Sequence, residues 1–219
     1  MKWIVILLCF LLSSCAHRGG WERASSARQG QKQSPVIILD PGHGGTSPGT
    51  KRNAAPVIVE KNLTLECALK VRDYLQKRGY IVRLTRTKDE DVSLHKRVDL
   101  AHQWGGTFFV SIHFNHAPNP RAHGIEIFYY NKSQGSPLTT QSKKLATTIL
   151  DSVVAGTKAK SRGVREGDYC VLRENRLPAV LIEGGFFSNA AEAKKLATPR
   201  YIDSLAQSIA EGIDRFVCS

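Results

Sequence analysis

The chain of 219 residues is short of long apolar runs and of acidic residues. Its one long apolar run covers residues 3–12, fewer than the ~20 residues that a membrane-spanning helix needs. Hydrophobic and charged fractions of 42% and 23% are ordinary for a globular protein, which excludes a multi-span membrane protein, a disordered chain and a coiled coil. The 19 Asp and Glu residues face 31 Lys and Arg residues, and the resulting net charge of +12 favours polyanionic partners.

Cysteine is also scarce, and the five cysteines show no C-x-x-C spacing of the kind that binds structural zinc. Two of them, Cys9 and Cys15, lie in the N-terminal segment. The other three, Cys67, Cys170 and Cys218, cannot all pair with one another. We expect small buried thiols at these positions. One disulfide among the three is possible, but the sequence does not show which two cysteines would form it.

The N-terminus has the order of features expected of a secretory signal. Lys2 precedes the apolar run, and small residues and Cys15 follow it. Residues 12–15, Leu-Ser-Ser-Cys, resemble the bacterial lipobox, in which cleavage leaves a lipid-modified cysteine at the new N-terminus. We therefore predict a signal peptide over 1–14, lipid attachment at Cys15 and a location on the periplasmic side of a bacterial envelope. The non-acidic Ala16 implies, by the same analogy, delivery to the outer membrane.

Residues 15–34 have the composition of a flexible tether, because they are rich in Gly, Ser, Arg and Gln and show no apolar period. Residues 35–219 keep a net charge of +8 and alternate apolar runs with helical spacing. The runs predict strands, and the spacing predicts helices. The strands are expected at 35–39, 56–59, 80–84, 107–112, 124–130 and 178–182, and the helices at 61–78, 93–104, 138–154 and 200–217. This alternation predicts a single α/β domain with a mostly parallel central sheet flanked by helices.

Side chains that can bind metal follow three of the predicted strands. His43 lies in a Gly-rich loop after the first strand, and His113 and Glu183 come directly after two later ones. Ligand sites in open α/β sheets lie beyond the carboxyl ends of the strands. Two imidazoles and a carboxylate are a ligand set for Zn²⁺ that leaves a fourth position for water.

Glu60, at the start of a predicted helix, adds a second carboxylate. One carboxylate would complete the metal site, and the other would move a proton between water and a leaving nitrogen. We also expect Asp40 to accept a hydrogen bond from the His43 ring and to orient it. Each residue alone has a simpler explanation, since a lone histidine is usually on the surface and Glu60 suits a helix N-terminus. Glu183 is the exception, because an acid after five apolar residues of a central strand is costly to bury without a partner.

Five motifs stand in order along the domain. They are D-P-G-H-G-G at 40–45, E-K-N-L-T-L at 60–65, T-R-T at 85–87, S-I-H-F-N at 111–115 and P-A-V-L-I-E-G-G-F-F-S-N at 178–189. Over about 35–216 the chain thereby resembles the zinc-dependent N-acetylmuramoyl-L-alanine amidases of bacterial cell walls. The resemblance implies a sheet flanked by helices and one Zn²⁺ per chain on His43, Glu60 and His113. It also implies that Glu183 is the catalytic acid and base, and that the substrate is peptidoglycan, cut at the amide joining N-acetylmuramic acid to L-alanine.

The sequence departs from that family at two places. Many members have an acid, in the order D-P-G, where this chain has Ser47-Pro48-Gly49. Some cell-division amidases insert a regulatory helix between the second histidine motif and the catalytic glutamate. Here the 70 positions from His113 to Glu183 are needed for strands, a helix and loops, so we expect an open site. Activating proteins stay unassigned.

Smaller signals leave alternatives open. Ser93 and Lys96 form the S-x-x-K pattern of penicillin-binding enzymes, which would add a serine carboxypeptidase activity on stem peptides. The S-D-N and K-T-G partners are absent, and Ser93 suits a helix N-cap. Asn115 is a candidate for binding substrate, and His116 and His123 are candidates for substrate contact, for metal binding or for solvated loop positions.

A functional alternative of a different class is a lipoprotein that binds peptidoglycan without cutting it. For the amidase and for the binding protein alike, the expected contact with the membrane is through the N-terminal lipid. Nucleic acid is not expected as a partner, since the predicted export argues against it and no basic–aromatic recognition motif is present.

Overall fold

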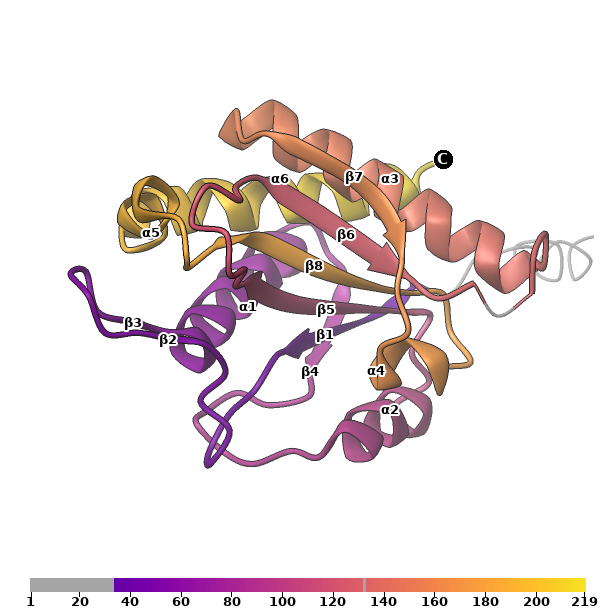
Figure 1. The fold of residues 1–219 in the computed structure, drawn as a ribbon. Coiled ribbons are helices and arrows are strands. Elements are labelled where there is room, and N and C mark those ends of the chain that lie inside the picture. The colour runs from indigo at the N-terminus through magenta and orange to yellow at the C-terminus, as the bar shows by residue number, and fades with distance from the viewer. Residues whose placement is uncertain (1–33, 132) are drawn as a thin grey trace, which may run out of the picture. The chain divides into compact units, whose positions relative to one another are not determined.

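A six-stranded sheet organises the domain in the computed structural model, which describes residues 34–131 and 133–219. Its strands are β1 (Val36–Pro41), β4 (Ile81–Leu84), β5 (Phe108–Asn115), β6 (Ile125–Tyr129), β7 (Ser161–Glu166) and β8 (Ala179–Phe186). The strand order is β4-β1-β5-β8-β6-β7 (Figure 1). Neighbouring strands are parallel except for β6 and β8, which are antiparallel. The predicted signal peptide, Cys15 and nearly all of the tether lie outside the described residues.

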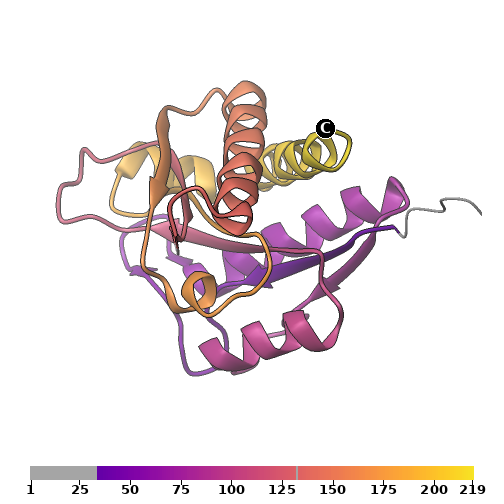
Figure 2. The same cartoon turned by 90° about the vertical axis from the view of Figure 1, so that its right-hand side faces the viewer.

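Helices cover both faces of this sheet. They are α1 (Glu60–Lys77), α2 (Leu94–Gln103), α3 (Pro137–Thr157), α4 (Cys170–Arg173), α5 (Ala190–Leu196) and α6 (Pro199–Val217). The long helices α1, α3 and α6 pack on one face, and the short helices α2 and α4 pack on the other (Figures 1 and 2). The predicted α/β domain with a mostly parallel central sheet is confirmed. Within the described part of the chain, no helix combines the length and the apolarity needed to cross a membrane.

Alternation along the strands decides which side chains reach which face. In β8, Leu181 belongs to the smaller core beneath α2 and α4, and Glu183 lies two residues further along the same face. Phe109 of β5 belongs to the same core, and His113 lies four residues further along that face. The functional side chains therefore project from the face that only two short helices cover, which leaves room for a pocket beside them.

The predicted end of the third helix is wrong. Helix α3 continues through Gly156 to Thr157 instead of ending before the glycine. A Cβ added at Gly156 would lie 2.1 Å from Ser208 Oγ of α6. This glycine therefore permits a close approach of two helices and does not terminate one.

Several short elements were not predicted. β7 is a polar strand at the edge of the sheet, so it has no apolar run in its sequence. α4 and α5 have four and seven residues, too few for helical spacing to be visible. The strand predicted at 56–59 is only partly present, since β3 (Ile58–Val59) pairs with β2 (Lys51–Arg52) in a hairpin outside the main sheet.

The three domain cysteines are free in the described structure, so the disulfide that the sequence left open is not formed. Cys67 is buried in α1, where burial raises the pKa of its thiol to about 12. Cys170 is half-buried and Cys218 is exposed.

Candidate active site

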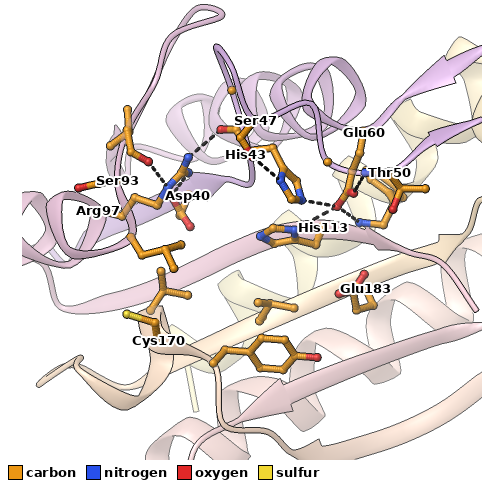
Figure 3. Close-up of a pocket in the computed structure, with 18 of the residues that line it drawn as sticks. Asp40, His43, Ser47, Thr50, Glu60, Ser93, Arg97, His113, Cys170 and Glu183 are labelled. Carbon is orange, nitrogen blue, oxygen red and sulfur yellow. Dashed lines mark hydrogen bonds and ion pairs between the residues drawn. The ribbon is translucent and has the colours of Figure 1, made fainter.

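Three predicted metal ligands come together at the carboxyl end of the sheet. His43 lies in the loop after β1, Glu60 is the first residue of α1, and His113 lies near the end of β5 (Figure 3). Glu60 Oε1 is 3.1 Å from His43 Nε2 and 3.1 Å from His113 Nδ1. One possible ligand atom from each residue lies within 4.8 Å of the others. The chain thus brings together a carboxylate and two imidazoles from segments far apart in sequence.

Two of the three separations between these atoms are compatible with a tetrahedral zinc ion. Zinc bonds of about 2.0–2.1 Å to nitrogen and oxygen place neighbouring ligand atoms roughly 3.3 Å apart. The two measured separations from the Glu60 oxygen are both 3.1 Å. Imidazole nitrogen and carboxylate oxygen are also ligands that zinc accepts. The donor set and the two Glu60 separations are therefore compatible with a site for one Zn²⁺.

Glu60 is fixed from both of its oxygens. Oε2 accepts a hydrogen bond from Thr50 N at 2.8 Å, and Oε1 accepts one from Phe114 N at 3.2 Å. Burial alone would raise the pKa of Glu60, but hydrogen bonds and charge from His113 and His43 outweigh it and hold the pKa below its ordinary value. The carboxylate is therefore ionised at neutral pH and held in place by two backbone N–H groups.

Two buried arginines hold the loop that carries His43. The His43 backbone has φ of 60°, in the left-handed region that residues other than glycine seldom adopt. Arg97 Nη2 donates to His43 O at 2.7 Å, and Arg97 Nη1 donates to Pro41 O at 2.7 Å. Arg86 Nη2 donates to Gly42 O at 2.8 Å. Three successive carbonyl groups are thus fixed by charged donors, which stabilises an otherwise strained conformation.

The predicted contact from Asp40 to the His43 ring is wrong. The Asp40 carboxylate accepts hydrogen bonds from Arg97 Nη1 at 2.7 Å, from Thr85 Oγ1 at 2.6 Å and from Ser111 Oγ at 2.7 Å. Burial alone would raise the pKa of Asp40, but the charge of Arg97 and these hydrogen bonds lower it overall. Asp40 therefore acts on the loop through Arg97 and not on the imidazole.

Ser47 takes the place next to the imidazole that we predicted for Asp40. Ser47 Oγ lies 3.2 Å from His43 Nδ1, the ring nitrogen on the far side from Glu60. Ser47 is the residue that stands where many members of the resembling family have an acid. A hydroxyl can fix the ring orientation as a carboxylate does, but without its negative charge.

Glu183 lies beside the three candidate metal ligands without joining them. It is paired in register with His113 of β5 and with Glu126 of β6. Its side chain is buried, and its Oε2 atom has no hydrogen-bond partner in the described structure. Burial, with the nearby charges of Glu60 and Glu126, raises the pKa of Glu183 well above its ordinary value. A buried carboxyl group that holds a proton readily suits acid–base chemistry.

Glu126 is a site residue that the sequence analysis missed. It is buried, and it accepts hydrogen bonds from Arg162 Nε at 2.9 Å and from Asn115 Nδ2 at 2.8 Å. Arg165 Nε lies 3.1 Å from the same carboxylate. Asn115, a predicted substrate contact, is therefore engaged with Glu126. The signal in the sequence was an acid at the second position of an apolar strand, where a polar side chain is costly to bury.

A cavity of about 1020 Å³ is lined by the three candidate metal ligands and Glu183, and it extends past Ser93 and Tyr169. Ser93 Oγ accepts a hydrogen bond from Lys96 N at 3.3 Å, so it acts as the N-cap of α2. The Lys96 side chain is not among the groups that line the cavity. His116 is exposed at the cavity wall, whereas the exposed His123 ring lies against Arg121 O at 2.8 Å.

Known proteins are similar to this chain in sequence and in fold. Residues 37–215 match a family described as N-acetylmuramoyl-L-alanine amidase. The sporulation-specific N-acetylmuramoyl-L-alanine amidase of Bacillus subtilis (strain 168) is 38% identical over 181 residues, covering 82% of this chain and 67% of that protein. The germination-specific amidase of the same organism is 32% identical over 237 residues, covering 99% and 94%. The crystal structure of an N-acetylmuramoyl-L-alanine amidase from Clostridium difficile 630 has a TM-score of 0.79 and 36% identity, covering 85% of this chain and 98% of that one. By the extent of these matches, the chain belongs to the N-acetylmuramoyl-L-alanine amidase family.

Proposed function

We propose that this chain hydrolyses the amide bond between N-acetylmuramic acid and L-alanine in peptidoglycan, with one Zn²⁺ held by His43, Glu60 and His113. The observation that carries the proposal is the convergence of these three side chains beside a buried acid. Two ligand separations of 3.1 Å and an unpartnered Glu183 oxygen lie in the same cavity. Membership of the amidase family supports the choice of substrate.

When bound, a zinc ion polarises a carbonyl and lowers the pKa of water to ~7. The protein residues supply the proton transfers around that chemistry. Glu183 takes the proton of the attacking water and delivers it to the departing amine nitrogen of L-alanine. The burial of Glu183 favours this shuttle, because a carboxyl group in an apolar setting accepts a proton more easily than one in water.

The cavity has room for a polymeric substrate. Between β5 and β8, only His116 and residues 169–171 contribute to its lining among the described residues. The long helix α3 packs on the opposite face of the sheet. This arrangement supports an open site, with α4 as the one helix of this segment that lines the cavity among the described residues.

The test is mass spectrometry of muropeptides incubated with the full-length chain, with and without a chelator. We expect release of stem peptides that begin at L-alanine, and loss of that release when zinc is removed. Glu183→Gln should retain zinc and lose turnover, whereas His113→Ala should lose both. Normal cleavage by Glu183→Gln would refute the proton shuttle, and unchanged muropeptides with the zinc-loaded protein would refute the amidase activity in favour of binding alone.

We also propose that the chain is lipid-anchored at Cys15 on the periplasmic side of a bacterial envelope, most simply in the outer membrane. The support is the sequence alone, in which small residues and Cys15 follow a short apolar run. Metabolic labelling with a fatty-acid analogue should label the wild type and leave Cys15→Ala unlabelled. Equal labelling of both proteins would show that Cys15 is not the attachment site.

A further inference from the structure

A second cavity adjoins the catalytic one and has the opposite charge. Its volume is about 350 Å³, and Thr50 and His116 line both cavities. The catalytic cavity contains several acids, whereas the lining of the second has none and includes Lys51 and Arg52. Among the described residues, neither of these two cations forms an ion pair with a carboxylate. The second cavity is therefore an uncompensated positive site.

Arg52 is anchored in this cavity by one hydrogen bond and keeps an unpaired N–H donor. Its Nη1 donates to Phe187 O at 3.2 Å, which ties the β2–β3 hairpin to the end of β8. Its Nε atom is buried and has no hydrogen-bond partner in the described structure. A guanidinium that is anchored on one side and unsatisfied on another is suited to bind a carboxylate, because a carboxylate accepts two of its N–H groups at once.

The contacts of Arg52 place it near the end of β5, beyond the candidate metal ligands. Phe187 N donates to Asn115 O at 2.8 Å, so Arg52 sits level with Asn115 at the end of β5. Asn115 lies two residues beyond His113, which corresponds to about 7 Å along a strand. In a peptide that begins at the cleaved amide nitrogen, one extended residue spans about 3.5 Å, and a carboxylate on the second Cα lies roughly 7 Å away. The second stem residue is therefore the one expected to lie level with the end of β5, where the cavity around Arg52 adjoins the catalytic cavity.

We infer that the cavity around Arg52 binds the free α-carboxylate on the second residue of the peptidoglycan stem, an inference that rests on the proposed amidase function. A stem whose second residue is a glutamate linked through its γ-carboxyl carries such a carboxylate. Lys51 and His116 border the same cavity and add positive charge or hydrogen-bond donors. The stem peptide then runs from the metal ligands toward the β2–β3 hairpin, and the glycan lies on the other side, toward Ser93 and Tyr169.

The test uses two muropeptides that differ only at this group, one with an α-carboxylate and one with an α-carboxamide on the second stem residue. The wild-type full-length chain should cleave the carboxylate form with the lower KM. Arg52→Ala should raise KM for that form about tenfold or more, the effect expected of losing a hydrogen-bonded charge, and leave kcat nearly unchanged. KM for the carboxamide form should not change, and Arg52→Lys should restore part of the preference.

The carboxamide substrate also separates recognition from folding. If Arg52→Ala distorts the hairpin, KM rises for both substrates by the same factor, and that result would overturn the inference. Lys143→Ala is the control for net charge, because Lys143 borders a separate cavity at α3, and it should change neither KM. Equal KM values for the two substrates with the wild type would also overturn the inference while leaving the amidase intact. Cleavage of neither substrate would overturn the amidase function itself.

Discussion

Gly42→Ala is the most stringent test of the active-site geometry, because it adds a single methyl group next to one ligand. A Cβ at this position would lie 2.2 Å from His113 Cε1, 2.3 Å from Nε2 and 2.6 Å from Nδ1. The backbone of Gly42 cannot easily retreat. Its N–H donates to Ile112 O at 3.0 Å, and its carbonyl accepts from Thr64 Oγ1 at 2.7 Å and from Arg86 Nη2 at 2.8 Å.

The imidazole must therefore move. Carbon atoms in ordinary contact lie about 3.5–4.0 Å apart, so the His113 ring has to shift by roughly 1 Å or more. Metal sites tolerate deviations of about 0.2 Å in their bond lengths. A misplacement of about 1 Å in a catalytic group can reduce the rate about 100-fold. We expect Gly42→Ala to weaken zinc binding and to lower kcat/KM by about that factor.

The assay measures zinc content after dialysis against a weak chelator, together with muropeptide cleavage and thermal unfolding. Gly106→Ala is the matched control, because its Cβ would lie 2.6 Å from Ile38 Cγ1 in the core beneath α2. It should cost about 1–3 kcal/mol of stability through overpacking and leave zinc binding intact. Normal zinc content and turnover in Gly42→Ala would show that His113 does not need its present position, and the proposed ligand set would then be wrong.

Two further predictions concern the loop that carries His43. Asp40→Asn should lower the free energy of unfolding by about 3–5 kcal/mol in urea titrations, because it leaves the charge of Arg97 buried without its partner. The folded-state pKa of Asp40 lies below its ordinary value of 3.8, so its contribution is present above that pH and is lost as the pH falls through the folded-state value. The difference between wild type and variant should therefore narrow only below about pH 4, and an unchanged difference there would contradict the argument. Ser47→Ala should leave the free energy of unfolding near the wild-type value and weaken zinc binding about tenfold in chelator competition. Ser47→Asp should strengthen zinc binding. Equal zinc affinity in the wild type and both variants would rule out a role for Ser47 in orienting His43.

The sequence predicted the parts of the fold that depend on local pattern. The apolar runs of β1, β5 and β8 are buried on both faces, so their sequences are continuous enough to recognise. His113 and Glu183 follow those runs, and the topology of a parallel sheet then brings them to one edge. β7 could not be recognised in this way, because one side of an edge strand is open to solvent and Ser161–Glu166 is accordingly polar.

Contacts between distant residues were the part that sequence did not reveal. Gly156 has the sequence signature of a helix terminus. A glycine is needed there because Ser208, 52 residues later, lies in the helix that packs against it. Arg97 follows Lys96 in a polar helix and has the local pattern of a solvated residue, yet it is buried. The ion pair with Asp40 and the hydrogen bonds to two loop carbonyls, all more than 50 residues away, offset the cost of burying the Arg97 charge. No periodicity within α2 encodes those partners.

The pairing of Asp40 with Arg97 also explains how a loop held by two guanidinium groups can lie beside a candidate cation site. Arg86 and Arg97 are both needed to satisfy the carbonyls of residues 41–43, but burial and the charge of Arg97 lower the pKa of Arg86. Two uncompensated guanidinium groups would also repel a metal ion bound to His43. Asp40 neutralises the charge of Arg97 and forms no hydrogen bond with the three candidate metal ligands. An acid placed three residues before a candidate metal ligand can thus act by fixing backbone and charge, and its position in the sequence does not distinguish this role from direct contact with the imidazole.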